Sequence, residues 1–293
     1  MSTNNDEFEL ERIFRVQGRV AVITGGGSGL GLMAAQALAV NGSKVYIVGR
    51  TASKLDRVVQ VHGQSIKGSI IPLVADISRK DEITRLVKEL EEREPHVDIV
   101  INNAGIYSSR QCPEGSNAEE VRRNLFDTEN ATFENWNDVY RTNVAAIYFV
   151  TTAFLPLLQR ASDRRPGWTS TVINISSING LIKESLSRFA SNAAKAATIH
   201  LTKMLAVEIA NCRLSIRVNS IAPGLFPSEI TAGSSDQSQK STLPPGTCSE
   251  ISAGRPGDDV DFAGAILFAV TNEYVNGQII AVDGGYLVKY GKL

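Results

Sequence analysis

Cysteine and histidine are scarce in this chain of 293 residues, which contains three of each. They are also scattered: the cysteines are Cys112, Cys212 and Cys248, and the histidines are His62, His96 and His200. No pair of them has the C-x-x-C or H-x-x-x-H spacing that is typical of a metal site. We therefore expect a protein of a reducing compartment without a structural metal.

A strong charge of either sign is also missing, because 30 basic residues face 31 acidic ones and the net charge is -1. This balance gives no electrostatic reason to bind nucleic acid or an anionic membrane, so a small molecule is the favoured partner. The sequence has no apolar run of 18 residues, and its polar, acidic N-terminus is unlike a signal peptide or a mitochondrial presequence. The expected location is the cytoplasm.

Short apolar runs that read as strands alternate with helical patterns along the chain. The expected strands lie in residues 19–24, 44–49, 69–76, 97–105, 169–176, 214–224 and 278–285. Strands that alternate with helices build a parallel sheet covered on both faces. We predict an α/β fold, a single-domain Rossmann-type doubly wound sheet of about seven parallel strands.

The predicted domain covers residues 18–293 and follows an N-terminal tail, residues 1–17. Two polar segments interrupt the alternation, residues 108–134 and 227–257, the first with a weak helical pattern. Long loops in a compact domain are often lids or binding segments, so we expect both to shape the function.

A glycine-rich turn joins the first predicted strand to the first helix, in the segment VITGGGSGLGLMAA. Its expected cofactor-binding residues are Gly25, Ser28, Gly29, Leu30 and Gly31. Backbone amides at the start of a helix can bind a pyrophosphate, so the turn indicates a nucleotide site. Asp76 and the segment of Asn103 close two other predicted strands, and the carboxyl ends of parallel strands meet where such sheets bind ligands.

These motifs together resemble the short-chain dehydrogenase/reductase family over nearly the whole chain. The segments that carry the resemblance are TGGGSGLG, ADI, NNAG, Asn143 in RTNVAA, NISS, NSIAPG and VDGG. The resemblance implies a nicotinamide cofactor bound by Gly25–Gly31, Asp76 and Asn103. It also implies that Pro223, Gly224 and Ser228 lie near the carboxamide, with Ile221 beside them in the wall of the same pocket.

The end of the second predicted strand, YIVGRT, distinguishes between the two nicotinamide cofactors. A carboxylate there would bind a ribose 2'-hydroxyl, but Gly49 occupies the position and Arg50 follows it. A guanidinium suits a 2'-phosphate, so NADP(H) is favoured over NAD(H).

The catalytic group of the family is Asn, Ser, Tyr and Lys, with the tyrosine four residues before the lysine. The resemblance places Asn143, Ser177 and Lys195 in three of these positions, and Ser191 stands where the tyrosine is expected. In the family the tyrosine moves the proton at the substrate carbonyl, and the lysine, bound to the cofactor ribose, lowers the tyrosine pKa. A serine hydroxyl is shorter and less acidic. Tyr107 is a candidate to reach the pocket from a loop.

Three functions therefore remain open at this point. The first is an NADP(H)-dependent oxidoreductase with an altered proton relay, acting on a carbonyl or hydroxyl group of a small molecule, such as an intermediate of secondary metabolism. The second is a non-redox enzyme, an isomerase or cyclase, in which positioning replaces acid catalysis. The third is a catalytically silent cofactor-binding protein.

Two further expectations concern the surroundings of the site. Residues 178–190 are expected to line the substrate side, and Leu225 and Phe226 indicate an apolar substrate face. The resemblance also implies a homodimer or homotetramer, paired through helices whose outer apolar positions would include Ile199, Met204 and Leu205.

Overall fold

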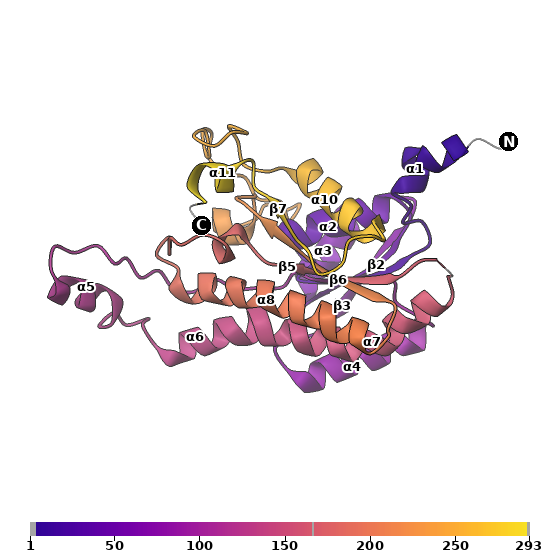
Figure 1. Ribbon diagram of the computed structural model, residues 1–293, viewed down its shortest axis with the longest axis horizontal. Helices are drawn as coiled ribbons and strands as arrows, with labels where there is room; N and C mark the ends of the chain where they lie inside the picture. Colours follow the sequence, from indigo (N-terminus) through magenta and orange to yellow (C-terminus); the bar gives the residue numbers. More distant parts are fainter. Residues whose placement is uncertain (1–3, 166, 292–293) are drawn as a thin grey trace.

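A seven-stranded parallel sheet forms the centre of the molecule, with helices on both faces (Figure 1). The computed structural model describes residues 4–165 and 167–291. The strands are β1 (Val20–Thr24), β2 (Lys44–Gly49), β3 (Ser69–Val74), β4 (Ile99–Asn102), β5 (Ser170–Ile175), β6 (Ile216–Pro223) and β7 (Ile279–Val282). Their order is β3-β2-β1-β4-β5-β6-β7. The predicted fold class is confirmed.

Alternation along the strands explains why both faces of the sheet are covered. Val22, Val100 and Val172 point to one face, and the next residue of each strand points to the other. On the first face lie α4 (Lys80–Arg93), α7 (Ala146–Asp163) and α8 (Phe189–Asn211), packed against the sheet around Leu86, Phe154 and Leu205. On the second lie α2 (Gly29–Val40), α3 (Ala52–His62) and α10 (Asp259–Thr271), packed around Leu38, Leu55 and Phe262.

The strand order reverses between β1 and β4, and this switch point positions the site. In the sheet register Thr24 of β1 lies beside Val48 of β2 and beside Asn102 of β4. The carboxyl ends of these three strands are therefore level. Ligands of open parallel sheets bind in the crevice at such a point.

A buried polar network ties α7 and α8 to the sheet directly below this crevice. The Asn102 amide donates to Thr151 Oγ1 at 3.0 Å and to Asn174 Oδ1 at 2.9 Å. The Asn174 amide in turn donates to Thr202 Oγ1 of α8 at 3.0 Å. Because buried donors are costly to leave unpaired, these bonds fix where α7 and α8 sit on β4 and β5.

The longest helical stretch, Phe133–Asp163, comprises α6 (Phe133–Tyr140), the π-helix η2 (Arg141–Ala145) and α7. Its length and hydropathy would suffice to cross a membrane, but half of its most apolar window is buried inside the protein. Phe154 and Leu157 are fully buried there against the sheet. The apolar character of this stretch thus has an explanation in core packing.

The two predicted loops and the tail contain short regular elements. Residues 108–134 include α5 (Ala118–Leu125), which has no buried residue and projects from the body of the molecule (Figure 1). Residues 227–257 include α9 (Glu229–Ala232), and the tail forms η1 (Asn4–Phe8) and α1 (Leu10–Ile13). The remaining elements are the 3₁₀ turn η3 (Ile178–Gly180) and α11 (Tyr286–Tyr290).

One expectation about α8 is wrong for two of its three residues. Ile199 and Leu205 are 8% and 6% exposed and face the protein interior, so neither is an outer position. Met204 is 45% exposed and does face outward. Their order along a helix of 3.6 residues per turn explains the difference, because neighbouring residues 204 and 205 cannot share a face.

Candidate active site

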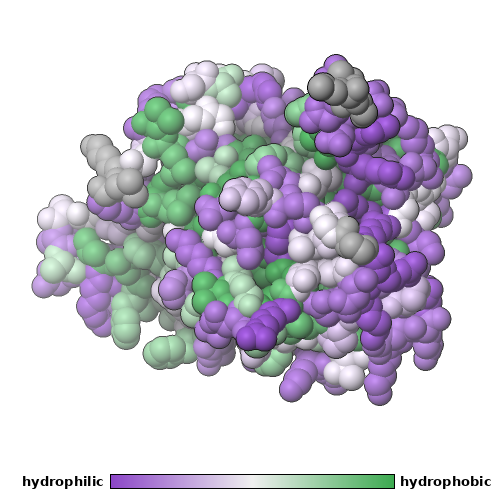
Figure 2. Space-filling model, turned by 45° about the vertical axis from the view of Figure 1, so that its right-hand side comes forward, coloured by the Kyte–Doolittle hydropathy of each residue, from purple (hydrophilic) through white to green (hydrophobic). Residues whose placement is uncertain are grey.

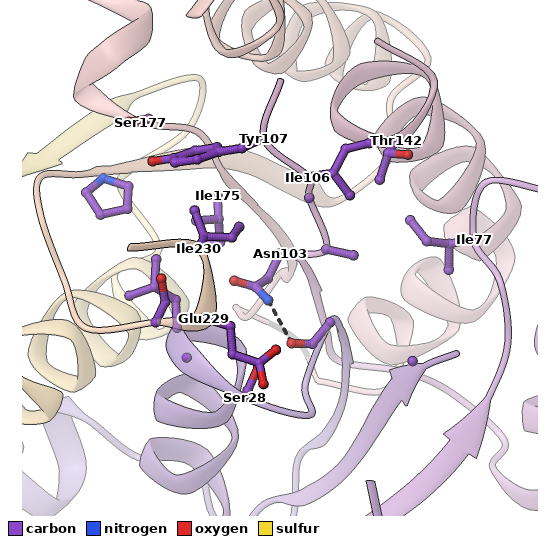
Figure 3. Close-up of a pocket in the computed structure, with 18 of the residues that line it drawn as sticks. Ser28, Ile77, Asn103, Ile106, Tyr107, Thr142, Ile175, Ser177, Glu229 and Ile230 are labelled. Atoms are coloured by element: carbon purple, nitrogen blue, oxygen red, sulfur yellow. Dashed lines mark hydrogen bonds between the residues drawn. The ribbon is translucent and has the colours of Figure 1, made fainter. Parts of the chain in front are cut away.

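A pocket of about 310 Å³ opens at the carboxyl edge of the sheet, over the switch point (Figure 3). Most of the predicted site residues line it: Gly25, Ser28, Gly29, Leu30, Arg50, Asp76, Asn103, Ser177, Lys195, Pro223, Gly224 and Ser228. Within the described ranges, Gly31, Asn143 and Ser191 are outside this lining. The structure therefore brings one long continuous site together from six of the seven strand ends or the segments that follow them.

The glycine-rich turn is folded tightly against β4. Gly25 has φ +68°, and a Cβ on Gly31 would lie 2.2 Å from the Gly25 carbonyl oxygen, so a side chain fits at neither position. The Asn103 amide donates to the carbonyl oxygens of Thr24 and Gly25, both at 3.0 Å. α2 begins at Gly29, and its first amides lack intrahelical acceptors. This cradle fits a pyrophosphate.

At the other end of the crevice, Asp76 and Arg50 line the pocket beyond β3 and β2. Asp76 Oδ1 accepts hydrogen bonds from the Ser78 backbone amide at 3.0 Å and from the Ser78 hydroxyl at 2.7 Å. Burial favours the neutral acid, but these bonds and the charge of Arg50 outweigh it and lower the pKa of Asp76. The carboxylate is held as a fixed acceptor, while Arg50 stays exposed and free to approach a phosphate.

Lys195 of α8 lies at the inner end of the pocket. Its Nζ donates to the carbonyl oxygen of Ile175, at the end of β5, at 2.8 Å. Gly105 approaches it closely, since a Cβ on that glycine would lie 3.8 Å from the Lys195 nitrogen. Burial lowers the pKa of Lys195 to about 8. The Lys195 ammonium therefore loses its proton more readily than an ordinary lysine does. The side chain can serve as a hydrogen-bond donor or give up its proton near neutral pH.

Asn143 contacts the neighbouring chain segment rather than the pocket. It is 1% exposed within the π-helix η2, and such single π turns recur at functional sites. Its Oδ1 accepts from the Ile106 amide and its Nδ2 donates to the Ile106 carbonyl, both at 2.9 Å. Both bonds fix the backbone that follows β4.

Ser177 and Ser191 have different surroundings. Ser177 lines the pocket and caps η3, because its Oγ accepts from the Asn179 amide at 3.1 Å. Ser191 is 2% exposed. Its Oγ accepts from the Ser108 amide at 2.6 Å and donates to the Ser108 hydroxyl at 3.1 Å. The hydroxyl of Ser191 is occupied in holding a loop.

The segment after β6 closes the pocket from the opposite side. Ser228 begins α9 with a capping box that includes Thr231. The Glu229 carboxylate accepts from Lys54 Nζ at 2.7 and 2.8 Å and from the Ser235 hydroxyl at 2.6 Å. Burial opposes ionisation, but these partners lower the pKa of Glu229. Residues 227–231 thereby lie against the glycine-rich turn, with Ser28 and Glu229 near one another in Figure 3.

Three of the lining residues, Ile106, Thr142 and Ile175, were not predicted from the sequence. Each is next to or near a predicted motif, namely NNAG, RTNVAA or NISS, so proximity was the available signal. Glu229, Ile230 and Thr231 also line the pocket and belong to the segment 227–257 that was expected to shape the function. One expectation about the walls is wrong, because Ile221 is fully buried in the core of the second face. Leu225 and residues 178–190 are not among the residues that line this pocket, so their place on the substrate side stays a prediction. Phe226 lines the pocket but is 3% exposed and packs edge-on against Phe262.

The described part of the chain was also compared with the requirements of a metal site. Across residues 4–165 and 167–291, no three His, Cys, Asp or Glu side chains are grouped to hold a metal ion.

Comparison with known proteins agrees with this geometry. The family described as short chain dehydrogenase matches residues 19–239. The chain is 36% identical over 282 residues to the short-chain dehydrogenase/reductase PhomF of Diaporthe leptostromiformis, covering 94% of this chain and 93% of the relative. It is 34% identical to the short-chain dehydrogenase/reductase VdtF of Byssochlamys spectabilis, covering 94% of each.

A solved structure is similar as well. The Pseudomonas aeruginosa RhlG/NADP active-site complex superposes with a TM-score of 0.75 at 30% identity, covering 94% of this chain and 98% of that one. The chain belongs to the short-chain dehydrogenase/reductase family, whose members are oxidoreductases that use nicotinamide cofactors. The family resemblance predicted from the motifs is confirmed.

The lowered pKa of Lys195 predicts a pH-dependent cost to stability. A folded-state pKa of about 8, against an ordinary value of 10.5, means that the buried charge is fully present well below pH 8 and is lost from the folded protein as the pH rises through 8. Lys195→Met removes that cost. We expect the melting temperature of Lys195→Met relative to wild type to be highest at pH 7 and to fall as the pH rises from about 8 to 10.5. Lys203→Met, exposed on the same helix, is the control. A constant difference across this range would contradict the prediction.

The packing of Ser191 predicts that a tyrosine at this position disturbs the fold locally. Ser191→Tyr must displace the Ser108 backbone, and overpacking costs about 1–3 kcal/mol. Ser191→Ala leaves the Ser108 amide without its acceptor, at a cost of about 1–3 kcal/mol. Both variants should unfold at lower denaturant concentration than wild type, whereas Ala193→Tyr, exposed on α8, should not. A Ser191→Tyr protein as stable as wild type would show that the space beside α8 is free.

Proposed function

We propose that this protein is an NADP(H)-dependent oxidoreductase that acts on a carbonyl or hydroxyl group of a small molecule. The observation that carries the proposal is one continuous pocket that joins the glycine-rich turn to Ser177 and Lys195. A bound nicotinamide nucleotide supplies or accepts a hydride. The turn at Gly25–Leu30 holds the pyrophosphate, Asp76 faces the adenine end, and Pro223, Gly224 and Ser228 hold the carboxamide.

The preference for NADP(H) rests on the charge at the adenosine end. Arg50 lines the pocket and is exposed, and Gly49 before it carries no carboxylate to repel a 2'-phosphate. Asp76 is occupied by Ser78 and is held two residues beyond β3. A guanidinium with no carboxylate at the end of β2 favours the phosphorylated ribose.

The proton relay of this enzyme differs from that of the family pattern. Position 191 would hold the catalytic tyrosine, and here the side chain is a short hydroxyl that is buried and bonded to Ser108. Asn143, Ser177 and Lys195 keep the remaining positions. Lys195 still lies where it can bind the cofactor ribose, while Asn143 acts by fixing the segment at Ile106.

The substrate is a small molecule with an apolar portion, and an intermediate of secondary metabolism is the class we favour. Beyond the turn the pocket is lined by Ile106, Ile175 and Ile230. A pocket of about 310 Å³ lies at the lower end of the usual range for small-molecule sites.

We also propose a cytoplasmic homodimer or homotetramer. Apolar side chains on α6, α7 and α8 remain exposed, namely Trp136, Tyr140, Tyr148, Phe149, Met204 and Val207. On the face shown in Figure 2, hydrophobic residues gather toward the left and the centre, while the right-hand side is mostly hydrophilic. Contiguous apolar patches on a protein surface are typical of association sites.

Cofactor choice is tested by binding. We expect NADPH to bind more tightly than NADH, and Arg50→Ala to weaken NADPH binding by about 10-fold to 100-fold while leaving NADH unchanged, because a charge-assisted hydrogen bond contributes about 1.5–3 kcal/mol. Isothermal titration with both cofactors gives the dissociation constants. Arg93→Ala, whose partner is Glu89, is the matched control. Equal loss of both cofactors in Arg50→Ala would contradict the role assigned to this arginine.

The reaction class is tested by NADPH consumption with a panel of ketones, quinones and conjugated imines. Loss of a general acid without replacement would reduce a typical turnover of about 10 per second to roughly 0.001–0.1 per second. We expect at least one carbonyl compound to be reduced faster than roughly 0.1 per second, because the pocket retains other proton donors. Tight NADPH binding without consumption would instead point to an isomerase, a cyclase or a silent binding protein.

A further inference from the structure

The residue Tyr107 is held in place through both of its chain neighbours. On one side, Asn143 bonds the amide and the carbonyl of Ile106, both at 2.9 Å. On the other, Ser191 accepts from the Ser108 amide at 2.6 Å, and the Arg188 guanidinium donates to the Ser108 carbonyl. Two positions of the family's catalytic group thus act here on the backbone around one tyrosine.

The Tyr107 side chain lies at the pocket. It lines the same cavity as Ser177 and Lys195, and Figure 3 shows its ring beside Ser177 and above Ile175. The Arg188 guanidinium packs over the ring, with its central carbon 4.8 Å from the ring centroid. This cation on one face, and the two fixed neighbours, limit the rotation of the phenol.

Tyr107 is also the one tyrosine in the described pocket lining. Tyr46 is buried in β2, outside this lining, and its hydroxyl donates to Glu94 at 2.7 Å. The remaining five are Tyr140, Tyr148, Tyr274, Tyr286 and Tyr290, none of them among the residues that form the cavity. In this pocket, Tyr107 is therefore the residue that can present a phenol to a substrate.

We propose that Tyr107 is the catalytic proton donor of this enzyme, in place of the tyrosine expected at position 191. The inference rests on the proposed oxidoreductase function. During reduction the substrate carbonyl carbon gains a hydride from the nicotinamide, which is oxidised. The carbonyl oxygen takes the hydroxyl proton of Tyr107, and the phenolate regains a proton from water.

The short side chain of Ser191 is what makes this arrangement possible. Ser191 leaves the Ser108 backbone room to lie against α8, and a second bond, from the Gln111 amide to the Ser187 carbonyl at 2.9 Å, continues the contact. A tyrosine at 191 would occupy the space of Ser108 and push Tyr107 away. In this arrangement the phenol comes from the loop after β4 instead of from α8.

The environment of the phenol keeps it protonated. Burial raises the pKa of Tyr107, and the nearby Arg188 offsets this only in part. At neutral pH the hydroxyl therefore carries the proton that the proposed step transfers to the carbonyl oxygen.

The first arm of the test is spectroscopic and needs no substrate. With ¹³C-labelled tyrosine, the ring resonance missing from Tyr107→Phe identifies Tyr107. The oxidised nicotinamide ring is cationic and the reduced ring is neutral, and a nearby cation lowers a phenol pKa by about 1–3 units. We expect the Tyr107 resonance to titrate about 1 unit or more lower with NADP⁺ than with NADPH. Identical titration with both bound cofactors would overturn the proposal.

The second arm is kinetic, on the carbonyl compound of the panel that the wild type reduces fastest. We expect Tyr107→Phe to lower kcat about 100-fold or more and to keep the dissociation constant of NADPH. The fall of kcat at alkaline pH that the wild type shows should be absent from this variant. Tyr274→Phe, fully exposed, is the control and should match wild type. A Tyr107→Phe enzyme with wild-type kcat would overturn the proposal even if the protein reduces carbonyls.

If the proposed oxidoreductase function is wrong, the measurements give a different result. If the wild type binds neither NADPH nor NADP⁺, the oxidoreductase function itself is wrong, and the role of Tyr107 falls with it. If it binds both and the Tyr107 resonance does not distinguish them, only the role of Tyr107 is wrong. Arg188→Met, which removes the cation over the ring, should raise the pKa of Tyr107 further and keep NADPH binding.

Discussion

The level carboxyl ends of β1, β2 and β4 are the constraint on which the site depends. Because Thr24 is in register with Val48 and Asn102, the residues that follow these strands meet at one edge. Asn103 then closes the turn by binding the carbonyls of Thr24 and Gly25. A shift of one residue in any of these strands would turn its side chains to the other face and separate the turn from Asn103.

The same segment after β4 links the glycine-rich turn to the part of the pocket that holds Ser177 and Lys195. Gly105 lies between Asn143 and Lys195, Ile106 is fixed by η2, and Ser108 is fixed by α8. The buried network from Asn102 through Asn174 to Thr202 holds α8 on the sheet below. In this way the position of a loop residue such as Tyr107 becomes as well defined as that of a helix residue.

Strand-forming runs and the glycine-rich turn made the fold and the position of the turn at the pocket predictable, because the physics there is local. Gly25 needs a positive φ and Gly31 a missing side chain, and both requirements show as glycines in the sequence. The residues in the walls of the pocket were harder to predict. Ile221 and Leu225 were expected at the pocket, but Ile221 points from β6 into the core of the second face. The face to which a side chain points and its depth in the protein depend on how the helices pack. The predicted outward positions of Ile199 and Leu205 were wrong for the same reason.

The sequence by itself determined the family, the sheet, the glycine-rich turn and the absence of a tyrosine four residues before Lys195, since each follows from residue types at fixed spacing. Only the tertiary structure decided what Ser191 does and where Tyr107 lies. The Ser108 amide that Ser191 binds is 83 positions away in the chain, and Asn143 binds Ile106 across 37 positions. Such contacts depend on how α8 and η2 pack beside the end of β4, and no local pattern encodes them.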